Sequence, residues 1–416
     1  MKKLFVAILS AAVLLSVSVI SYAKQPVVKP GIEVLRESGF QRLVGKRVGL
    51  VTNPSGVDSQ LRSTIDILYN APGVNLVALY GQEHGVRGDV YAGGAVTDTK
   101  DEKTGLPVYS LYGATRKPTK EMLKGIDVMV YDIQDVGARS YTFISTLGLV
   151  MEACSEAGVE VVILDRPNPL GGNKIEGCYV EPGFNSFVSQ YKIPYIYGLT
   201  VGELAVMINE EGMNRGQKGD EKHVKCKLSV VPMEGWKRDM VYADTKLPWV
   251  LPSPNIPTAE AAIYYPSAGI CGEYYGYLNI GIGYTLPFGV FGATWIDAQK
   301  LKQKLDSYKI EGTAFRTIYY KPIAGAQKGE LVQGVQYFYT DYKKAKITLT
   351  QFYIMQAVNE LYPDHQPTGV GLFDKVCGTG YIRLNFAKRH MVADIEEYWN
   401  KDVAAFKKLS KKYFLY

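Results

Sequence analysis

Polar side chains that could carry out hydrolytic chemistry follow four apolar stretches of the chain. Ligands of open α/β sheets bind beyond the carboxyl ends of the parallel strands. If the apolar stretches are such strands, their polar ends surround one crevice. These residues are Asn53 after the first stretch, Glu83, His84 and Arg87 after the second, Asp132, Gln134, Asp135 and Arg139 after the third, and Asp165, Arg166 and Asn168 after the fourth.

Several carboxylates with arginines and one histidine fit two kinds of hydrolysis. Glycoside hydrolysis needs one carboxyl group that stays protonated as general acid and a second carboxylate that supports positive charge or activates water. A metal-dependent hydrolase needs a convergent set of Asp and His ligands. The chain has 4 histidines, of which His84 alone falls in the group. This disfavours a transition-metal site and leaves an all-oxygen magnesium site as an alternative.

Glu83 is the expected general acid. It follows the apolar residues VNLVALY (74–80), and an apolar surrounding favours the protonated form of a carboxyl group. Gly81 and Gly85 flank it and allow the backbone to turn sharply. The ionised partner is expected to be Asp132 or Asp135, and the sequence does not choose between them.

The elements that must position these residues alternate between strand and helix. Apolar stretches without polar alternation, separated by helices, indicate a parallel sheet with helices on both faces. Thr200 followed by Glu203 is a capping-box pattern that starts a helix. The pattern predicts strands at 47–53, 74–80, 126–133 and 159–165, and helices at 61–69, 142–157 and 200–211.

Residues 248–257 contain four prolines and cannot form regular structure. We interpret them as the bridge between an α/β N-terminal domain (24–250) and a smaller α+β C-terminal domain (251–416). In the second domain the spacing predicts helices near 297–306, 349–361 and 391–411.

Composition excludes several classes of function. The net charge is +6 with both signs spread along the chain, so nucleic acid is not an expected partner. No GxGxxG, GxxxxGK[ST], GxSxG or HExxH pattern occurs where it would indicate function, so we expect no nucleotide cofactor, no serine hydrolase and no bound metal. The 31 tyrosines suit a partly wet binding cleft.

The first 23 residues have the layout of a signal peptide. Lys2 and Lys3 precede the apolar stretch 4–20, and Ser21 and Ala23 give a small-x-small cleavage site. This site favours cleavage after Ala23 over a retained membrane anchor. We therefore expect an exported protein, periplasmic or extracellular, with no stable membrane anchor.

Read together, the strand ends and several further blocks resemble the exo-β-N-acetylmuramidase (NamZ) family. The resemblance implies a Rossmann-like N-terminal domain, a smaller C-terminal domain, and release of non-reducing-end N-acetylmuramic acid from peptidoglycan fragments. It also implies that Glu83 is the acid of the EHG block and that the other strand-end residues surround the substrate. The matching blocks include GLVTNPSGVD (49–58), GQEHGVRGD (81–89), YDIQDVGARSYTFISTLG (131–148), VILDRPNPLGG (162–172) and LPSPNIPT (251–258).

One block departs from the family's pattern. Residues 271–289 read CGEYYGYLNIGIGYTLPFG, where the family typically carries further glutamates and arginines. Glu273 stands in for the first glutamate, and Ile282 and Leu286 occupy the arginine positions. We expect Glu273 and Tyr274 to bind the substrate, the latter through its ring. The alternative is an exported sugar-binding protein of the same fold without turnover.

Muramic acid differs from glucosamine by a lactyl carboxylate. A forked guanidinium suits a carboxylate better than an ammonium group does. Among the strand-end residues, Arg87, Arg139 and Arg166 are the candidates to hold it.

Overall fold

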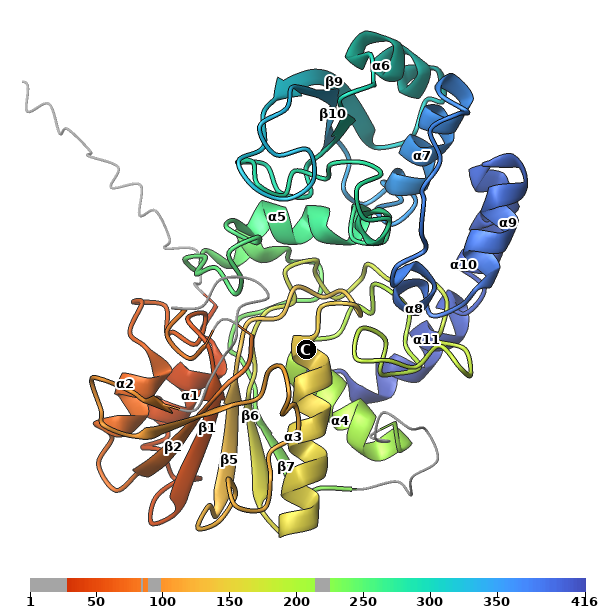
Figure 1. The fold of residues 1–416 in the computed structure, drawn as a ribbon. Coiled ribbons are helices and arrows are strands. Elements are labelled where there is room, and N and C mark those ends of the chain that lie inside the picture. The colour runs from red at the N-terminus through yellow and green to blue at the C-terminus, as the bar shows by residue number, and fades with distance from the viewer. Residues whose placement is uncertain (1–27, 84, 89–98, 214–224) are drawn as a thin grey trace, which may run out of the picture.

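A mostly parallel sheet forms the centre of the N-terminal half of the chain (Figure 1). The computed structural model describes residues 28–83, 85–88, 99–213 and 225–416. Within these ranges the sheet has seven strands in the order β3-β4-β2-β1-β5-β6-β7. Neighbouring strands are parallel except β3, which is antiparallel to β4. The strands are β1 (Arg47–Thr52), β2 (Asn75–Gly81), β3 (Thr99–Lys100), β4 (Pro107–Ser110), β5 (Val128–Asp132), β6 (Glu160–Leu164) and β7 (Leu228–Val231).

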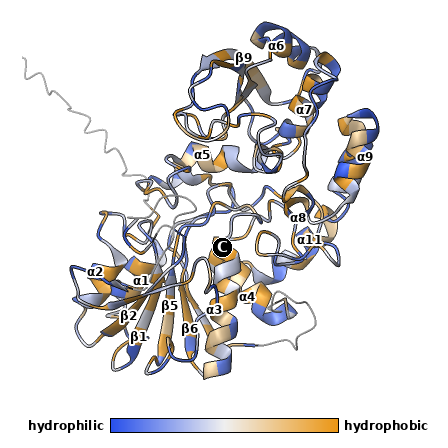
Figure 2. Ribbon diagram, in the orientation of Figure 1, coloured by the Kyte–Doolittle hydropathy of each residue, from blue (hydrophilic) through white to orange (hydrophobic). Residues whose placement is uncertain are grey.

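Helices cover both faces of this sheet, which confirms the predicted α/β fold. α1 (Gly31–Glu37) and α2 (Thr64–Tyr69) pack on one face, and α3 (Phe143–Ala157) and α4 (Val201–Glu211) on the other (Figure 1). In β5, Val128 and Val130 pack in the apolar cluster that includes α1 and α2. Met129 and Tyr131 pack in the cluster that includes α3 and α4. Both faces of the strand are buried, which is why its sequence lacks polar alternation. In Figure 2 the strands of the sheet are mostly hydrophobic, whereas α6 at the far end of the molecule is largely hydrophilic.

The N-terminus of α4 has the predicted capping box. The Thr200 hydroxyl accepts a hydrogen bond from the Glu203 backbone N–H at 3.2 Å, and the Glu203 carboxylate accepts one from the Thr200 N–H at 3.0 Å. The same hydroxyl donates to Asp165 Oδ2 at 2.7 Å. The cap therefore also holds a side chain at the carboxyl end of β6.

The prediction that residues 248–257 lack regular structure is confirmed. Beyond them, β8, β10 and β9 form an antiparallel sheet in that order, and α6 packs against it. The helices and strands of this part of the chain are α5 (Ala259–Tyr264), β8 (Val290–Ala293), α6 (Ala298–Ser307), β9 (Thr313–Tyr320), β10 (Val332–Tyr339), α7 (Thr350–Leu361), α8 (Phe373–Cys377), α9 (Tyr381–Arg389), α10 (Glu396–Trp399) and α11 (Val403–Ser410).

The helix predicted for 391–411 is broken into shorter pieces. Between α10 and α11 the side chains of Asn400 and Asp402 turn to the N-terminal domain. They accept hydrogen bonds from the backbone N–H groups of Gly177 at 3.4 Å and Tyr179 at 2.9 Å. These tertiary contacts replace helix continuation, so the break could not be read from the local apolar spacing.

After α11 the chain returns to the large sheet (Figure 1). The Tyr416 hydroxyl donates to Asp165 Oδ2 at 2.8 Å and accepts from the Met233 N–H at 2.7 Å. The guanidinium of Arg238 lies 3.4 Å from the centre of the Phe414 ring. The second domain is thereby fastened to the strand ends of the first. No helix in the described part of the chain is long and apolar enough to cross a membrane.

Candidate active site

A cleft of about 180 Å³ opens between the carboxyl end of the large sheet and the second domain. Glu83 follows β2 on one side, residues 140–143 lead from β5 into α3, and the proline-rich bridge passes along the rim. The second domain contributes two aromatic rings. The lining residues are Glu83, Ser140, Tyr141, Thr142, Phe143, Ser253, Asn255, Ile256, Tyr265 and Phe288.

Glu83 is the predicted catalytic carboxylate that lines this cleft. It is half-buried, and the Tyr112 hydroxyl donates a hydrogen bond to its Oε1 at 2.9 Å. Burial, together with the neighbouring charge of Glu83, raises the pKa of Tyr112 to about 12. The phenol therefore stays protonated as a hydrogen-bond donor to Glu83.

Aromatic rings form one continuous wall of the cleft. Tyr141 contacts Phe143 edge-on with centroids 4.6 Å apart, and it contacts Tyr265 at 5.4 Å. Tyr265 in turn contacts Phe288 at 5.1 Å. The wall thus runs from the start of α3 into the second domain, and its flat apolar rings suit the faces of a sugar.

Asp135 is a second carboxyl group near this wall, although it is buried and does not itself line the cleft. Tyr197 donates a hydrogen bond to its Oδ2, as does the Gly137 N–H at 2.8 Å. Its Oδ1 is buried and has no hydrogen-bond partner among the described residues. Burial raises the pKa of Asp135 to about 6.

The charges of Asp135 and Glu83 both affect the pKa values of Tyr141 and Tyr265. Burial raises the pKa of both Tyr141 and Tyr265, and the charges of Asp135 and Glu83 add to the increase. Both carboxyl groups therefore lie near enough to these two phenols for their charges to affect them.

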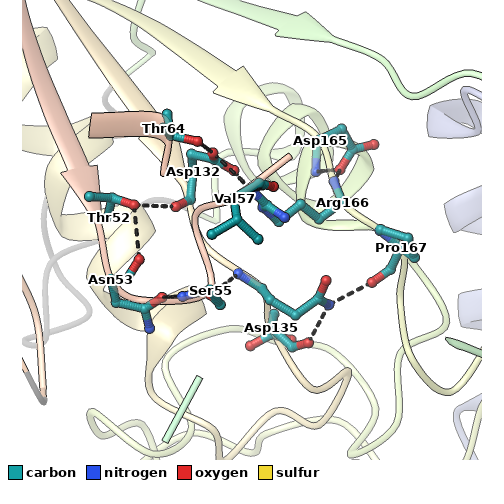
Figure 3. A network of polar contacts seen from close by, with 12 residues as sticks. Thr52, Asn53, Ser55, Val57, Thr64, Asp132, Asp135, Asp165, Arg166 and Pro167 are labelled. Atoms are coloured by element: carbon teal, nitrogen blue, oxygen red, sulfur yellow. Dashed lines mark hydrogen bonds and ion pairs between the residues drawn. The ribbon is translucent and has the colours of Figure 1, made fainter. Parts of the chain in front are cut away.

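Asp132, by contrast, is fully engaged in a buried ion pair. Arg166 Nε lies 2.5 Å from Asp132 Oδ1 and its Nη2 lies 2.9 Å from Oδ2. Thr64 Oγ1 donates to Oδ2 at 2.5 Å, and Arg166 also donates to the carbonyl of Val57 at 2.8 Å. Figure 3 shows this pair joining the ends of β5 and β6 to the loop after β1. Neither side chain lines the cleft.

Three predicted amide side chains hold the loops that follow the strands. Asn53 Nδ2 donates to the carbonyl of Pro252 in the bridge at 3.2 Å. Gln134 Nε2 donates to the carbonyl of Pro167 at 2.7 Å (Figure 3). Asn168 packs so closely on Gly137 that a Cβ there would lie 2.3 Å from its Oδ1. These residues support the loops around the cleft and do not line it.

The arginines predicted to bind the lactyl carboxylate are bound to other groups of the protein. Arg87 pairs with Asp101 at 2.5 Å and with Asp66 at 3.3 Å. Arg139 is fully buried and donates to four backbone carbonyls and a serine hydroxyl. Those carbonyls tie two segments of the first domain to the end of α8 in the second, so Arg139 is a structural residue. They belong to Cys178, Ile193, Val376 and Cys377.

Asp165 is also a structural residue of the strand ends. It is fully buried and accepts hydrogen bonds from Thr200, from the Gly202 N–H at 2.8 Å and from Tyr416. Burial raises the pKa of Asp165 to about 6. His84 lies outside the described residues.

The altered block 271–289 reaches the cleft through Phe288 among the described residues. Tyr274 is buried and stacks on Phe373 with centroids 4.4 Å apart. Glu273 is half-buried, and burial raises its pKa. The structure therefore does not bring Tyr274 to the cleft, where its ring was expected to bind substrate. It borders a separate cavity of about 290 Å³ within the second domain.

Sequence reasoning missed the aromatic wall and the polar rim. Tyr141 and Phe143 fall at a helix start, where apolar residues are expected to fill the core. Ser253 and Asn255 lie in the bridge, which was interpreted only as a linker. Most buried tyrosines lie in the cores of the two domains and not in the cleft. The number of tyrosines therefore did not indicate where the cleft lies.

The fold and this cleft define a class of protein. A half-buried Glu and a buried Asp near aromatic rings, at the carboxyl ends of a parallel sheet, are groups that glycoside hydrolysis can use. No set of three or more His, Cys, Asp or Glu side chains in the described ranges could hold a metal ion.

Comparison with known proteins identifies the family. The N-terminal model of exo-β-N-acetylmuramidase NamZ matches residues 48–260, and the C-terminal model matches residues 263–416. The chain therefore belongs to the NamZ family of exo-β-N-acetylmuramidases, which are glycosidases. The resemblance found in the sequence is confirmed.

Relatives match both domains. The chain is 44% identical over 395 residues to the peptidoglycan β-N-acetylmuramidase NamZ of Bacillus subtilis (strain 168), covering 95% of this chain and 92% of that protein. The crystal structure of a DUF1343 family protein from Bacteroides fragilis has a TM-score of 0.88 at 53% identity, covering 94% of this chain and 99% of that one. A second such structure from the same organism gives 0.74 at 29% identity, with the same coverage.

Proposed function

We propose that this protein is an exo-acting glycoside hydrolase that releases N-acetylmuramic acid from the non-reducing ends of peptidoglycan fragments. The observation that carries the proposal is the 44% identity, over 95% of the chain, to a peptidoglycan β-N-acetylmuramidase, together with the match to both exo-β-N-acetylmuramidase family models. The cleft volume of about 180 Å³ lies below the roughly 300–1,000 Å³ of pockets for drug-sized ligands. This favours one terminal sugar over an extended glycan.

In the proposed reaction, Glu83 donates its proton to the glycosidic oxygen as the bond to the anomeric carbon breaks. Asp135, ionised, stabilises the positive charge that develops on the sugar or activates the attacking water. Asp135 is preferred to Asp132 because its Oδ1 has no partner among the described residues, whereas both oxygens of Asp132 are bound by Arg166 and Thr64.

We also propose that the protein is exported, to the periplasm or beyond. Residues 1–23 support this through their basic start, apolar stretch and small-x-small end. Cell fractionation of the full chain and of a variant without residues 2–23, with N-terminal sequencing of the product, tests it. A mature chain that starts at Lys24 outside the cytoplasm is expected, and retention of residues 1–23 would contradict the proposal.

The test of activity is incubation with a chromogenic N-acetylmuramyl glycoside and its N-acetylglucosaminyl counterpart, with and without a chelator. The proposal expects turnover of the muramyl substrate that the chelator leaves unchanged. The changed block 271–289 favours a second candidate, a sugar-binding protein without turnover, because Ile282 and Leu286 replace charged residues. Binding without turnover would support that candidate, and loss of turnover with chelator would support a metal-dependent hydrolase.

A further inference from the structure

Arg116 follows Tyr112, the hydrogen-bond partner of Glu83, by four residues in the sequence. The Tyr112 hydroxyl donates to Glu83 at 2.9 Å, and the positive charge of Arg116 lowers the pKa of Tyr112 against the raising effects of burial and Glu83. The guanidinium carbon of Arg116 lies 4.3 Å from the centre of the Phe187 ring. Cation–π contact of this kind fixes the plane of a guanidinium.

Phe187 connects Arg116 to the wall of the cleft. Its carbonyl accepts a hydrogen bond at 2.7 Å from the hydroxyl of Ser145, which belongs to the first turn of α3. Thr142 and Phe143 at the start of that helix line the cleft. Through Phe187, Arg116 is therefore connected to the start of α3, which borders the cleft, although Arg116 itself is not among the lining residues.

Arg116 differs from the other arginines near the strand ends in what it binds. Arg87 and Arg166 are paired with carboxylates, and Arg139 is saturated by carbonyls. Arg116 has no ion pair with any described residue, and its buried Nε has no hydrogen-bond partner there. A buried donor without a partner costs free energy, which an anionic ligand group would recover.

We propose that Arg116 binds the lactyl carboxylate of N-acetylmuramic acid and so selects muramyl over glucosaminyl substrates. The proposal rests on the proposed function. A planar guanidinium can donate two parallel hydrogen bonds to a carboxylate, and this contact is lost when the carboxyl group is missing or converted to an amide.

The experiment compares two substrates on the same enzyme. One is a chromogenic N-acetylmuramyl glycoside with a free lactyl carboxylate, and the other is the same glycoside with that group amidated. Arg116→Met is expected to lower kcat/KM for the free acid by roughly 10- to 100-fold, mostly through KM, because hydrogen bonds to charged groups are of that strength. The amide should change little. The ratio of the two rates is insensitive to a loss of folded protein.

Arg316→Met is the matched control, because Arg316 is exposed on β9 and donates to Gln336 at 2.7 Å. It should leave the ratio at the wild-type value. Arg116→Lys, which keeps the charge without the fork, should fall between wild type and Arg116→Met. A ratio in Arg116→Met equal to that of wild type would overturn the assignment.

A failure of the proposed function gives a different result. In that case the wild-type chain would cleave neither glycoside, and calorimetry with free N-acetylmuramic acid and N-acetylglucosamine decides about Arg116. Tighter binding of N-acetylmuramic acid that disappears in Arg116→Met supports the assignment. Equal binding of the two sugars by the wild type, or no binding at all, overturns it.

Discussion

Burial raises the pKa of Asp135 from 3.8 to about 6. Because the folded-state pKa lies above the unfolded one, this group's contribution to stability is fully present below about pH 3.8 and is lost as the pH rises through about 6. At about 1.4 kcal/mol per pKa unit, keeping Asp135 ionised at neutral pH costs about 3 kcal/mol. A side chain retained at that cost is a candidate for function.

Asp135→Asn should therefore raise the free energy of unfolding at pH 8, by about 1–3 kcal/mol, and change it little at pH 4, while it abolishes turnover. Urea unfolding at the two pH values measures this. Asp132→Asn is the control, since it leaves the buried Arg166 without its charge partner and should destabilise by about 3–5 kcal/mol. An equal effect of Asp135→Asn at both pH values would contradict the buried-charge account.

At the residue scale, the predicted residue Glu83 lines the cleft, whereas most of the other predicted site residues do not. Glu83 could be predicted because a long apolar strand leads directly to it. Arg139 and Asp165 could not be separated from cleft residues, because their partners come from α8, Thr200 and Tyr416, far away in the sequence. The same limit hid Tyr265 and Phe288.

At the scale of elements, the residue that caps α4 also binds a side chain at the end of β6. Thr200→Ala removes the cap of α4 and a donor to Asp165, so it should lower the free energy of unfolding by about 2 kcal/mol. Thr258→Ala is the control, because Thr258 caps α5 through the Ala261 N–H at 3.1 Å. That change should cost about 1 kcal/mol. Equal losses in chemical unfolding would show that the contact with Asp165 adds nothing.

The elements that sequence predicted best are those whose signals are local. The strands that became β1, β2, β5 and β6 are continuous apolar runs, and α3 ends at Gly158, which adopts a left-handed φ of 70°. The short helices α8 and α9 were missed. The end of α8 is held by Arg139 of the first domain rather than marked by apolar spacing.

At the scale of the whole molecule, Arg139 fastens the two domains together. Arg139→Met leaves four buried carbonyls without their donor, and we expect a loss of about 3 kcal/mol or more in the free energy of unfolding. The folded fraction should keep the wild-type ratio of free-acid to amidated muramyl substrate. A variant of normal stability with a changed ratio would instead make Arg139 a substrate contact.

The overall architecture could be predicted from sequence because a parallel sheet and a proline-rich bridge leave plain patterns. The cleft could not, since it is closed by Tyr265 and Phe288 of the second domain over residues of the first. The way in which the two domains meet depends on side-chain contacts between residues that are far apart in the sequence.

The most direct test of the account is the kcat of Glu83→Gln on a defined fragment with N-acetylmuramic acid at its non-reducing end. The released sugar is identified by mass spectrometry. Gln keeps the shape and removes the proton, so kcat should fall by roughly 10²-fold or more with little change in binding, while the wild type releases the terminal sugar alone. A Gln variant with near-wild-type kcat, or a wild type that cuts within the glycan, would contradict the account.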